Sequence, residues 1–199
     1  MSFVYSEMDR LIIERWSDVV GLIGAHNQTQ DRIEQMIETV GERLGRWAHA
    51  HGFEIETQAK WAEFKAAKTS WIDKRKGPKV QLALGGFCPM GYRKMEAEHP
   101  YLCLYVDRLS EAFRLREPEV VAFSRGLRSA LGPDARAWDG PDVNDTSSPL
   151  DQHIVSISNS DRAKLIATED SLFDFATERL PMLFGLAEHI DGELAKLSR

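Results

Sequence analysis

The chain has 199 residues, 43% of them hydrophobic and 28% charged, and its formal net charge is −6. This length supports one well-buried core, and the composition excludes a disordered or collagen-like chain. The longest apolar runs, such as residues 11–13, are far shorter than the roughly 20 residues that cross a bilayer. Acidic residues near the N-terminus argue against a signal peptide. We therefore expect one cytoplasmic domain, residues 1–199, without a membrane partner.

The two cysteines, Cys88 and Cys103, are too few for a disulfide framework. Their spacing does not match a CxxC redox or zinc pair, and apolar residues surround both. We expect two reduced, packed thiols, in keeping with a reducing compartment.

Residues 1–50 are predicted to form two helices. Apolar residues recur at three- and four-residue steps in residues 8–23 and again in residues 33–47, which is typical of amphipathic helices. Gly24 and the polar residues 25–28 are expected to end the first helix, and Thr29 to cap the second. The short connection predicts an antiparallel helical hairpin.

Residues 51–158 are predicted to form the sheet. Alternating or β-branched runs bounded by glycine and proline are typical of strands. The predicted strands are residues 53–57, 79–87, 101–107 and 153–157. A helix is expected from Pro118 to Leu131, where Gly132 and Pro133 stop it, and residues 139–149 are expected to form a polar, mobile loop.

Residues 160–198 are predicted to form a long helix, kinked or interrupted at Pro181. From Leu172 onward its apolar residues follow a spacing close to a heptad seam. The seam can pack inside the chain or pair with a second copy as a homo-oligomer. The predicted fold is α+β, with the N-terminal hairpin and the C-terminal helix packed on a central antiparallel sheet of about four strands.

Basic residues are concentrated in residues 60–94, which we call the cationic island. It carries nine Lys or Arg against two acids, a net charge of +7, whereas residues 1–59 carry −5 and residues 95–199 carry −8. An acidic protein or a nucleic acid is attracted to such a surface, and aromatic residues among the cations can stack on bases. The residues predicted to bind are Trp71, Lys74, Arg75, Lys76, Lys79, Tyr92, Arg93 and Lys94.

Two further interpretations of the island remain open. Trp61, Phe64 and Lys68 have helical spacing, so the aromatics can be core residues and the lysines a solvated face. The acidic helices of the chain can also neutralise the cations, in which case the protein is an oligomeric structural scaffold.

Glu63-Phe64-Lys65 resembles the E-x-K motif of restriction-endonuclease-like nucleases, with Glu54 or Glu56 as a second carboxylate. The resemblance implies that the carboxylates hold a divalent metal and that Lys65 orients the attacking water. No Pro-Asp pair precedes the motif, and the surrounding stretch is not clearly apolar. A metal-dependent nuclease using Glu54, Glu56, Glu63 and Lys65 is therefore the alternative function.

Other catalytic patterns fail. Residues 86–93 have the two glycines of a phosphate loop, but Tyr92 stands where the phosphate-binding lysine belongs. No group of His, Cys and acidic residues has metal-ligand spacing, and no G-x-S-x-G elbow is present. We expect a non-catalytic binding protein without metal or cofactor.

Overall fold

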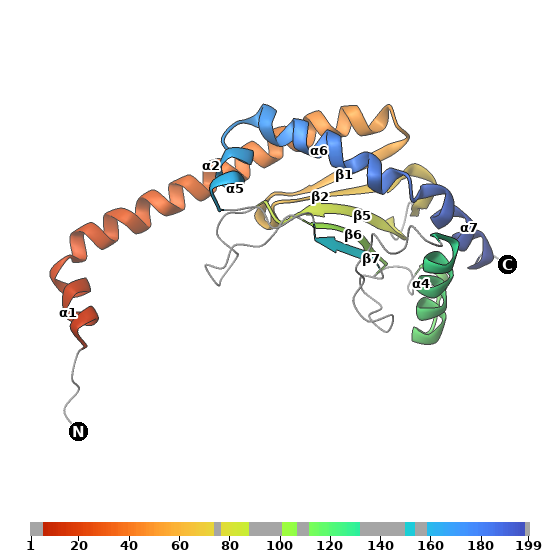
Figure 1. Cartoon of the computed structure of the whole chain (residues 1–199), viewed down its shortest axis with the longest axis horizontal. Coiled ribbons are helices and arrows are strands. Elements are labelled where there is room, and N and C mark those ends of the chain that lie inside the picture. The colour runs from red at the N-terminus through yellow and green to blue at the C-terminus, as the bar shows by residue number, and fades with distance from the viewer. Residues whose placement is uncertain are drawn as a thin grey trace, which may run out of the picture.

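A computed structural model describes residues 6–73, 77–87, 101–106, 112–131, 150–153 and 159–197. The described helices are α1 (Glu7–Glu14), α2 (Trp16–His49), α4 (Glu117–Leu131), α5 (Asn159–Leu165), α6 (Glu169–Phe184) and α7 (Ala187–Leu197). The described strands are β1 (Phe53–Gln58), β2 (Glu63–Lys68), β3 (Ile72–Asp73), β4 (Gly77–Pro78), β5 (Gln81–Gly85), β6 (Tyr101–Tyr105) and β7 (Leu150–His153). Two short 3-10 helices, η1 (Ala59–Trp61) and η2 (Thr69–Trp71), flank β2. The predicted α+β class is confirmed (Figure 1).

Five strands form one antiparallel sheet in the order β1-β2-β5-β6-β7, and β3 pairs with β4 separately. The strands predicted at residues 79–87 and 101–107 contain β5 and β6, and the one predicted at residues 53–57 covers all of β1 but Gln58. The strand predicted at residues 153–157 meets β7 at His153, and its other residues lie outside the described part of the chain. The predicted helix from Pro118 to Leu131 is confirmed as α4.

Strand β2 occupies a segment where sequence spacing favours a helix. It pairs with β1 along its whole length, from Gln58 opposite Glu63 to Phe53 opposite Lys68. Side chains alternate between the two faces of β2, and the Phe64 side chain lies in the core. Pairing with β1 on one side and β5 on the other therefore outweighs the weak helical pattern of the segment. This hairpin places Glu63 and Lys65 within the sheet.

Helix α2 runs unbroken from Trp16 to His49, so the predicted hairpin over residues 1–50 is wrong. The polar residues 25–28 continue the helix, because this stretch contains no proline to break it. Thr29, the predicted cap, donates its hydroxyl to the Ala25 carbonyl one turn earlier, at 2.9 Å. The break comes instead at Arg15, between α1 and α2. The N-terminal half of α2 therefore projects away from the sheet (Figure 1).

The C-terminal half of α2 and helix α6 lie side by side over one face of the sheet (Figure 1). Burial of apolar side chains between these layers, worth about 25 cal/mol per Å², is the main force that holds them together. The largest side chains in this core belong to Trp71, Phe64, Phe87, Ile37, Leu44, Leu82, Leu84, Leu102, Leu104 and Leu127.

The C-terminal region forms α5, α6 and α7 rather than one long helix, which corrects the prediction for residues 160–198. Thr168 starts α6 by accepting a hydrogen bond from the Ser171 amide at 3.1 Å. Pro181 lies in the last turn of α6, where the Gly185 amide donates to its carbonyl at 3.0 Å. The interruption expected near this proline is the junction between α6 and α7.

The predicted apolar seam of the C-terminal region is buried inside the chain. Seven of its members from α6 and α7 are each at most 8% exposed: Leu172, Ala176, Leu180, Leu183, Ala187, Ile190 and Leu194. The last member, Leu197, is partly buried and packs against the core. A homo-oligomer through this seam would require these residues to leave the core. The suggested use of the C-terminal helix as a dimer interface is therefore corrected.

Candidate functional site

Residues 74–76 and 88–94 of the cationic island lie outside the described residues. This applies to six of the eight residues predicted to bind: Lys74, Arg75, Lys76, Tyr92, Arg93 and Lys94. Their role in binding an acidic protein or a nucleic acid stays a prediction.

Trp71 is a core residue and not a stacking platform. It is 1% exposed and packs edge-on against Phe53, with ring centroids 6.0 Å apart. Its indole N–H donates to Asp191 Oδ1 of α7 at 2.6 Å, and the Lys68 amine pairs with the same carboxylate. The predicted contact of Trp71 with a base is therefore corrected. The Lys68 pair also means that an acidic helix of the chain neutralises part of the island.

Two other described cations of the island, Lys65 and Lys79, are partly covered. The Lys79 amine lies 5.0 Å from the centroid of the Phe113 ring, a cation–π contact, and the Lys65 amine is 3.3 Å from Glu63. Among the described cations and aromatics of residues 60–94, Lys60 and Trp61 alone are exposed. The described part of the island thus offers little surface to an anionic partner.

A polar cluster lies on the second face of the sheet, turned away from α2 and α6. Because side chains alternate along a strand, Phe64 and Leu102 enter the core while Glu63 and Tyr101 lie on the opposite face. Ala62 precedes the cluster in the left-handed conformation, with φ of 47°, and turns the chain from η1 into β2.

Glu63 is the centre of this cluster. Its carboxylate is 3% exposed, and its Oε1 accepts hydrogen bonds from the hydroxyls of Tyr101 at 2.9 Å and Tyr105 at 2.8 Å. Its Oε2 lies 3.3 Å from the Lys65 amine, which also lies 4.7 Å from the centroid of the Tyr105 ring. Both carboxylate oxygens are therefore engaged, as a buried charge requires.

Strand β5 leaves room for this contact between β2 and β6. Gly85 is opposite Tyr101 in the sheet. A Cβ atom at Gly85 would lie 2.7 Å from the Tyr101 ring and 3.1 Å from Glu63 Cγ. Glycine at this position therefore lets the Tyr101 ring cross β5 and reach the carboxylate.

The environment of the cluster keeps both phenols protonated. Burial, followed by the negative charge of Glu63, raises the pKa of Tyr101 far above its usual value. Burial, followed by the nearby Cys103, raises the pKa of Tyr105 in the same direction. Both residues consequently act as hydrogen-bond donors, and the arrangement is that of a satisfied buried network.

The raised phenol pKa values predict a loss of stability at high pH. Below pH about 10 both phenols are protonated in the folded and unfolded states, and the stabilisation is complete. Above it the unfolded phenols ionise while the folded ones hold their protons, so unfolding becomes easier by up to about 1.4 kcal/mol per pH unit for each phenol. Urea unfolding of wild type and of the double variant Tyr101→Phe/Tyr105→Phe at pH 8 and pH 11 measures this effect. Between the two pH values, the free energy of unfolding should fall more for wild type than for the variant. Equal losses would contradict it.

The residues of the alternative nuclease motif share the second face but do not converge as a metal site. Glu56 is opposite Lys65 in the sheet and accepts a hydrogen bond from the Gln81 amide at 3.1 Å. Glu54 lies further along β1 and is exposed. In the described part of the chain, no three His, Cys, Asp or Glu side chains are grouped so that they could hold a metal ion.

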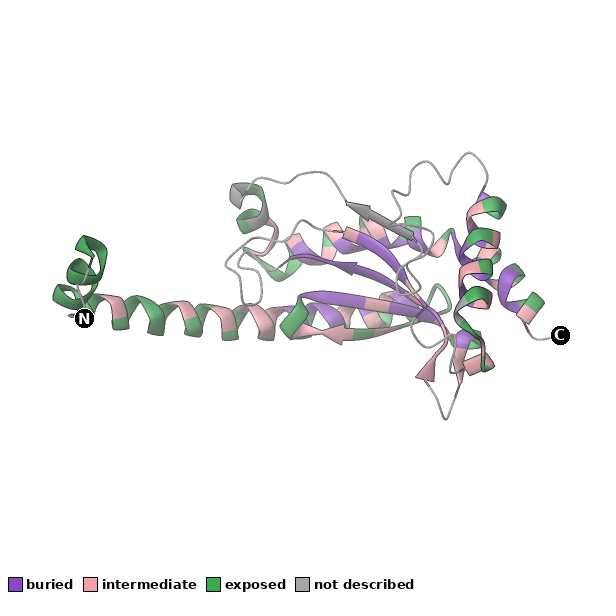
Figure 2. Cartoon of the chain, turned by 90° about the horizontal axis from the view of Figure 1, so that it is seen from below, coloured by how far each residue is buried: buried purple, intermediate pink, exposed green. Residues whose placement is uncertain are grey.

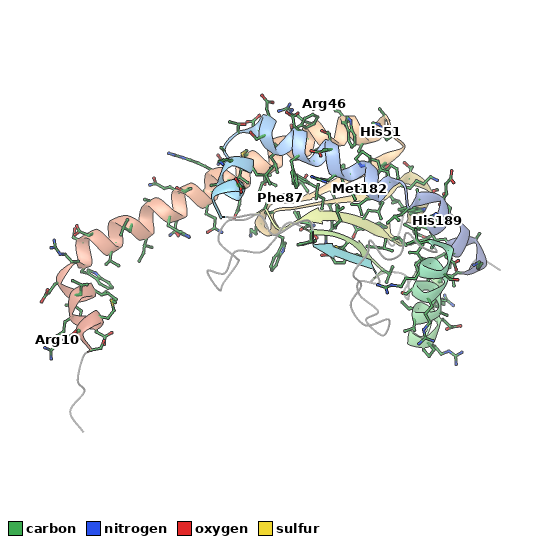
Figure 3. The ribbon with its side chains drawn as sticks, in the orientation of Figure 1. Arg10, Arg46, His51, Phe87, Met182 and His189 are labelled. Atoms are coloured by element: carbon green, nitrogen blue, oxygen red, sulfur yellow. The ribbon has the colours of Figure 1, made fainter. Side chains whose placement is uncertain are left out.

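A groove of about 560 Å³ lies between α2 and β1. Its titratable lining residues are Glu42, Arg46, His49 and Glu54, of both charge signs and all exposed. Arg46 projects outward from α2 (Figure 3). An open groove with exposed charges of both signs has no marked preference for one ligand class.

Among the described residues, most of the exposed large apolar side chains belong to residues 7–30, which we call the N-terminal arm: α1 and the first half of α2. Figure 2 shows this arm projecting from the body with most of its surface exposed. Its large apolar side chains that are between 38% and 71% exposed are Met8, Leu11, Ile12, Ile13, Trp16, Val20, Leu22 and Ile23. This surface was not predicted from the sequence, because the predicted hairpin buries the same residues. The unbroken absence of proline across residues 16–49 was the available signal for one long helix.

No described helix is both long and apolar enough to cross a membrane. In comparisons with known proteins, no family model, no curated protein and no solved structure matches the chain.

Proposed function

We propose that this chain is a non-catalytic interaction protein whose binding element is the N-terminal arm. One observation carries the proposal: eight large apolar side chains between Met8 and Ile23 are at least 38% exposed. Contiguous apolar patches larger than a few hundred Å² are rare on monomeric proteins and mark interaction sites. A partner that covers the arm would remove this surface from water.

The composition of the arm supports the same proposal. Residues 16–30 include two glycines, Gly21 and Gly24, and four β-branched residues, all of which weaken an isolated helix. A helix of this length is marginal in water even with favourable residues, and most helices are stabilised by packing of an apolar face. The arm therefore needs a partner to hold its helical form.

The undescribed part of the cationic island remains a candidate for a second contact. Lys74, Arg75 and Lys76 are the strongest group, and an acidic protein or a nucleic acid fits their charge. A metal-dependent nuclease is the alternative function, resting on the adjacent Glu63 and Lys65. It has less support, because two tyrosines and the lysine already occupy the Glu63 carboxylate.

Hydrogen exchange of the full-length chain tests the proposal. In dilute, monomeric samples, the amides of residues 16–30 should exchange at least about 1,000-fold faster than those of β5 and β6, because most side chains of this segment are exposed in the described part of the chain. Slow exchange of the arm in a monomeric sample would mean that the chain covers its own arm. The arm would then be a structural element, and the proposal would be wrong.

A further inference from the structure

The seam of side chains that anchors α2 to its own body continues into the arm, where it is apolar at Trp16, Val19 and Ile23 and polar at His26 and Gln30. One series of positions, at alternating steps of three and four residues, forms a heptad seam along the helix: Trp16, Val19, Ile23, His26, Gln30, Ile33, Ile37, Val40, Leu44 and Trp47. From Ile33 onward the seam is half-buried or buried against the sheet and α6. Before it, Trp16 is 59% and Ile23 54% exposed. Val19, His26 and Gln30 are half-buried. The same face of the helix thus packs on the body along its second half and exposes Trp16 and Ile23 in its first half.

We infer that the uncovered half of the seam pairs with the same segment of a second copy of this chain. The inference rests on the proposed function, because it names the partner of the arm. A symmetric pair buries the same residues from both copies, which is the commonest form of association among soluble oligomers.

The charge pattern of the arm favours a second copy over other partners. From Trp16 to Gln30, no Asp, Glu, Lys or Arg occupies a seam position. The positions that flank the seam on the helix surface, the e and g positions of the heptad, are also uncharged: Val20, Leu22, Asn27 and Thr29. Like charges therefore do not meet when two identical seams pack together. Residues 7–30 as a whole carry four acids and two arginines and no lysine, so anionic lipid and nucleic acid are repelled.

The geometry favours an antiparallel pair. A parallel partner helix following the same face would meet the chain's own sheet and α6 from Ile33 onward, where the seam is already occupied. An antiparallel partner centred on Gly21 places Val19 of one copy against Ile23 of the other. The bend at Arg15 of the partner helix then lies near Asn27 of the first copy, before the residues of α2 that pack on the body. The two bodies lie at opposite ends, as the projecting arm in Figure 1 allows.

The exposed apolar side chains of the arm supply a large part of the area that a stable dimer buries. A specific interface buries about 800 Å² on each partner. Eight large apolar side chains, together with Val19, supply several hundred Å² of this on each copy. Four of these eight lie on α1, before the bend, and they include Leu11 and Ile12, which are 53% and 38% exposed.

Sedimentation velocity of the full-length chain over a concentration series tests the inference. Wild type should form a dimer, and Ile23→Glu should weaken dimerisation by about 100-fold or more, because it brings two carboxylates into the seam. Gln28→Glu is the matched control: it adds the same charge on the outer side of the helix and should leave the dimer intact. Gly21→Ala should also keep it, because a Cβ there would meet no described atom within 4 Å on the outer side.

The outcomes separate this inference from the proposed function. A monomeric wild type whose arm exchanges rapidly would overturn pairing with a second copy but leave the arm as a binding element. A monomer whose arm is protected would overturn both. Equal weakening by Ile23→Glu and Gln28→Glu would overturn the seam as the interface. Binding of the monomer to anionic vesicles, lost in Ile23→Glu, would assign the arm to a lipid surface instead.

Discussion

Replacing Leu183 with aspartate is expected to destabilise the protein severely. Leu183 is fully buried in α6, at 0% exposed, within the core shared with α2 and the sheet. The substitution removes apolar contacts and puts an unpaired carboxylate into that core, a loss of at least about 4 kcal/mol. The total free energy of unfolding of a native domain is about 5–15 kcal/mol. Chemical denaturation followed by circular dichroism measures the loss.

Met182→Asp is the control for this prediction. Met182 is the preceding residue of α6 and is 44% exposed (Figure 3), so the same charge stays in water. We expect a change of no more than about 1 kcal/mol, including a small unfavourable interaction with the C-terminal end of the helix. A folded, monomeric Leu183→Asp would instead assign this residue to a subunit interface and contradict its place in the core.

Gly41→Ala is expected to destabilise the fold by about 2–3 kcal/mol, through overpacking between α2 and β1. A Cβ atom at Gly41 would lie 1.9 Å from Thr57 Oγ1 and 2.9 Å from Thr57 Cβ. Both atoms belong to a short, stiff side chain, so the helix and the strand must separate to accommodate the methyl group. Thermal and urea unfolding measure the effect, and adding Thr57→Ala should recover part of it.

Gly45→Ala provides the comparison one helical turn later. A Cβ atom at Gly45 would meet no described atom within 4 Å. Alanine favours helix over glycine, so this variant should gain about 0.5–1 kcal/mol. If both glycine variants change stability in the same direction and by the same amount, the close packing of α2 on β1 is not present.

The elements that were predictable from sequence are those with strong local signals. In the sequence, Pro118 marks the start of α4 and the Gly132-Pro133 pair marks its end. Runs of β-branched or aromatic residues mark β1, β5 and β6. Helix α2 was mispredicted because polar residues 25–28 are typical of turns, yet an exposed helix tolerates them at little cost. Strand β2 was missed because its pairing with β1 and β5, rather than its own residue pattern, decides its conformation.

The candidate sites depended on information that a single sequence does not carry. The alternation of Glu63 and Lys65 is visible in the chain, but the convergence of Tyr101 and Tyr105 on Glu63 requires the register of three strands. An apolar stripe predicts burial without saying what covers it. For residues 33–47 the cover is the chain's own sheet, whereas for Trp16 and Ile23 it is absent from the described part of the chain.

The central claim is that the arm is an interaction element stabilised by a second copy. Hydrogen exchange of residues 16–30, measured across a series of protein concentrations, tests it most directly. The account predicts that protection of these amides rises with concentration, in step with the dimer seen by sedimentation, while β5 and β6 stay equally protected throughout. Protection of the arm that does not change with concentration would contradict it.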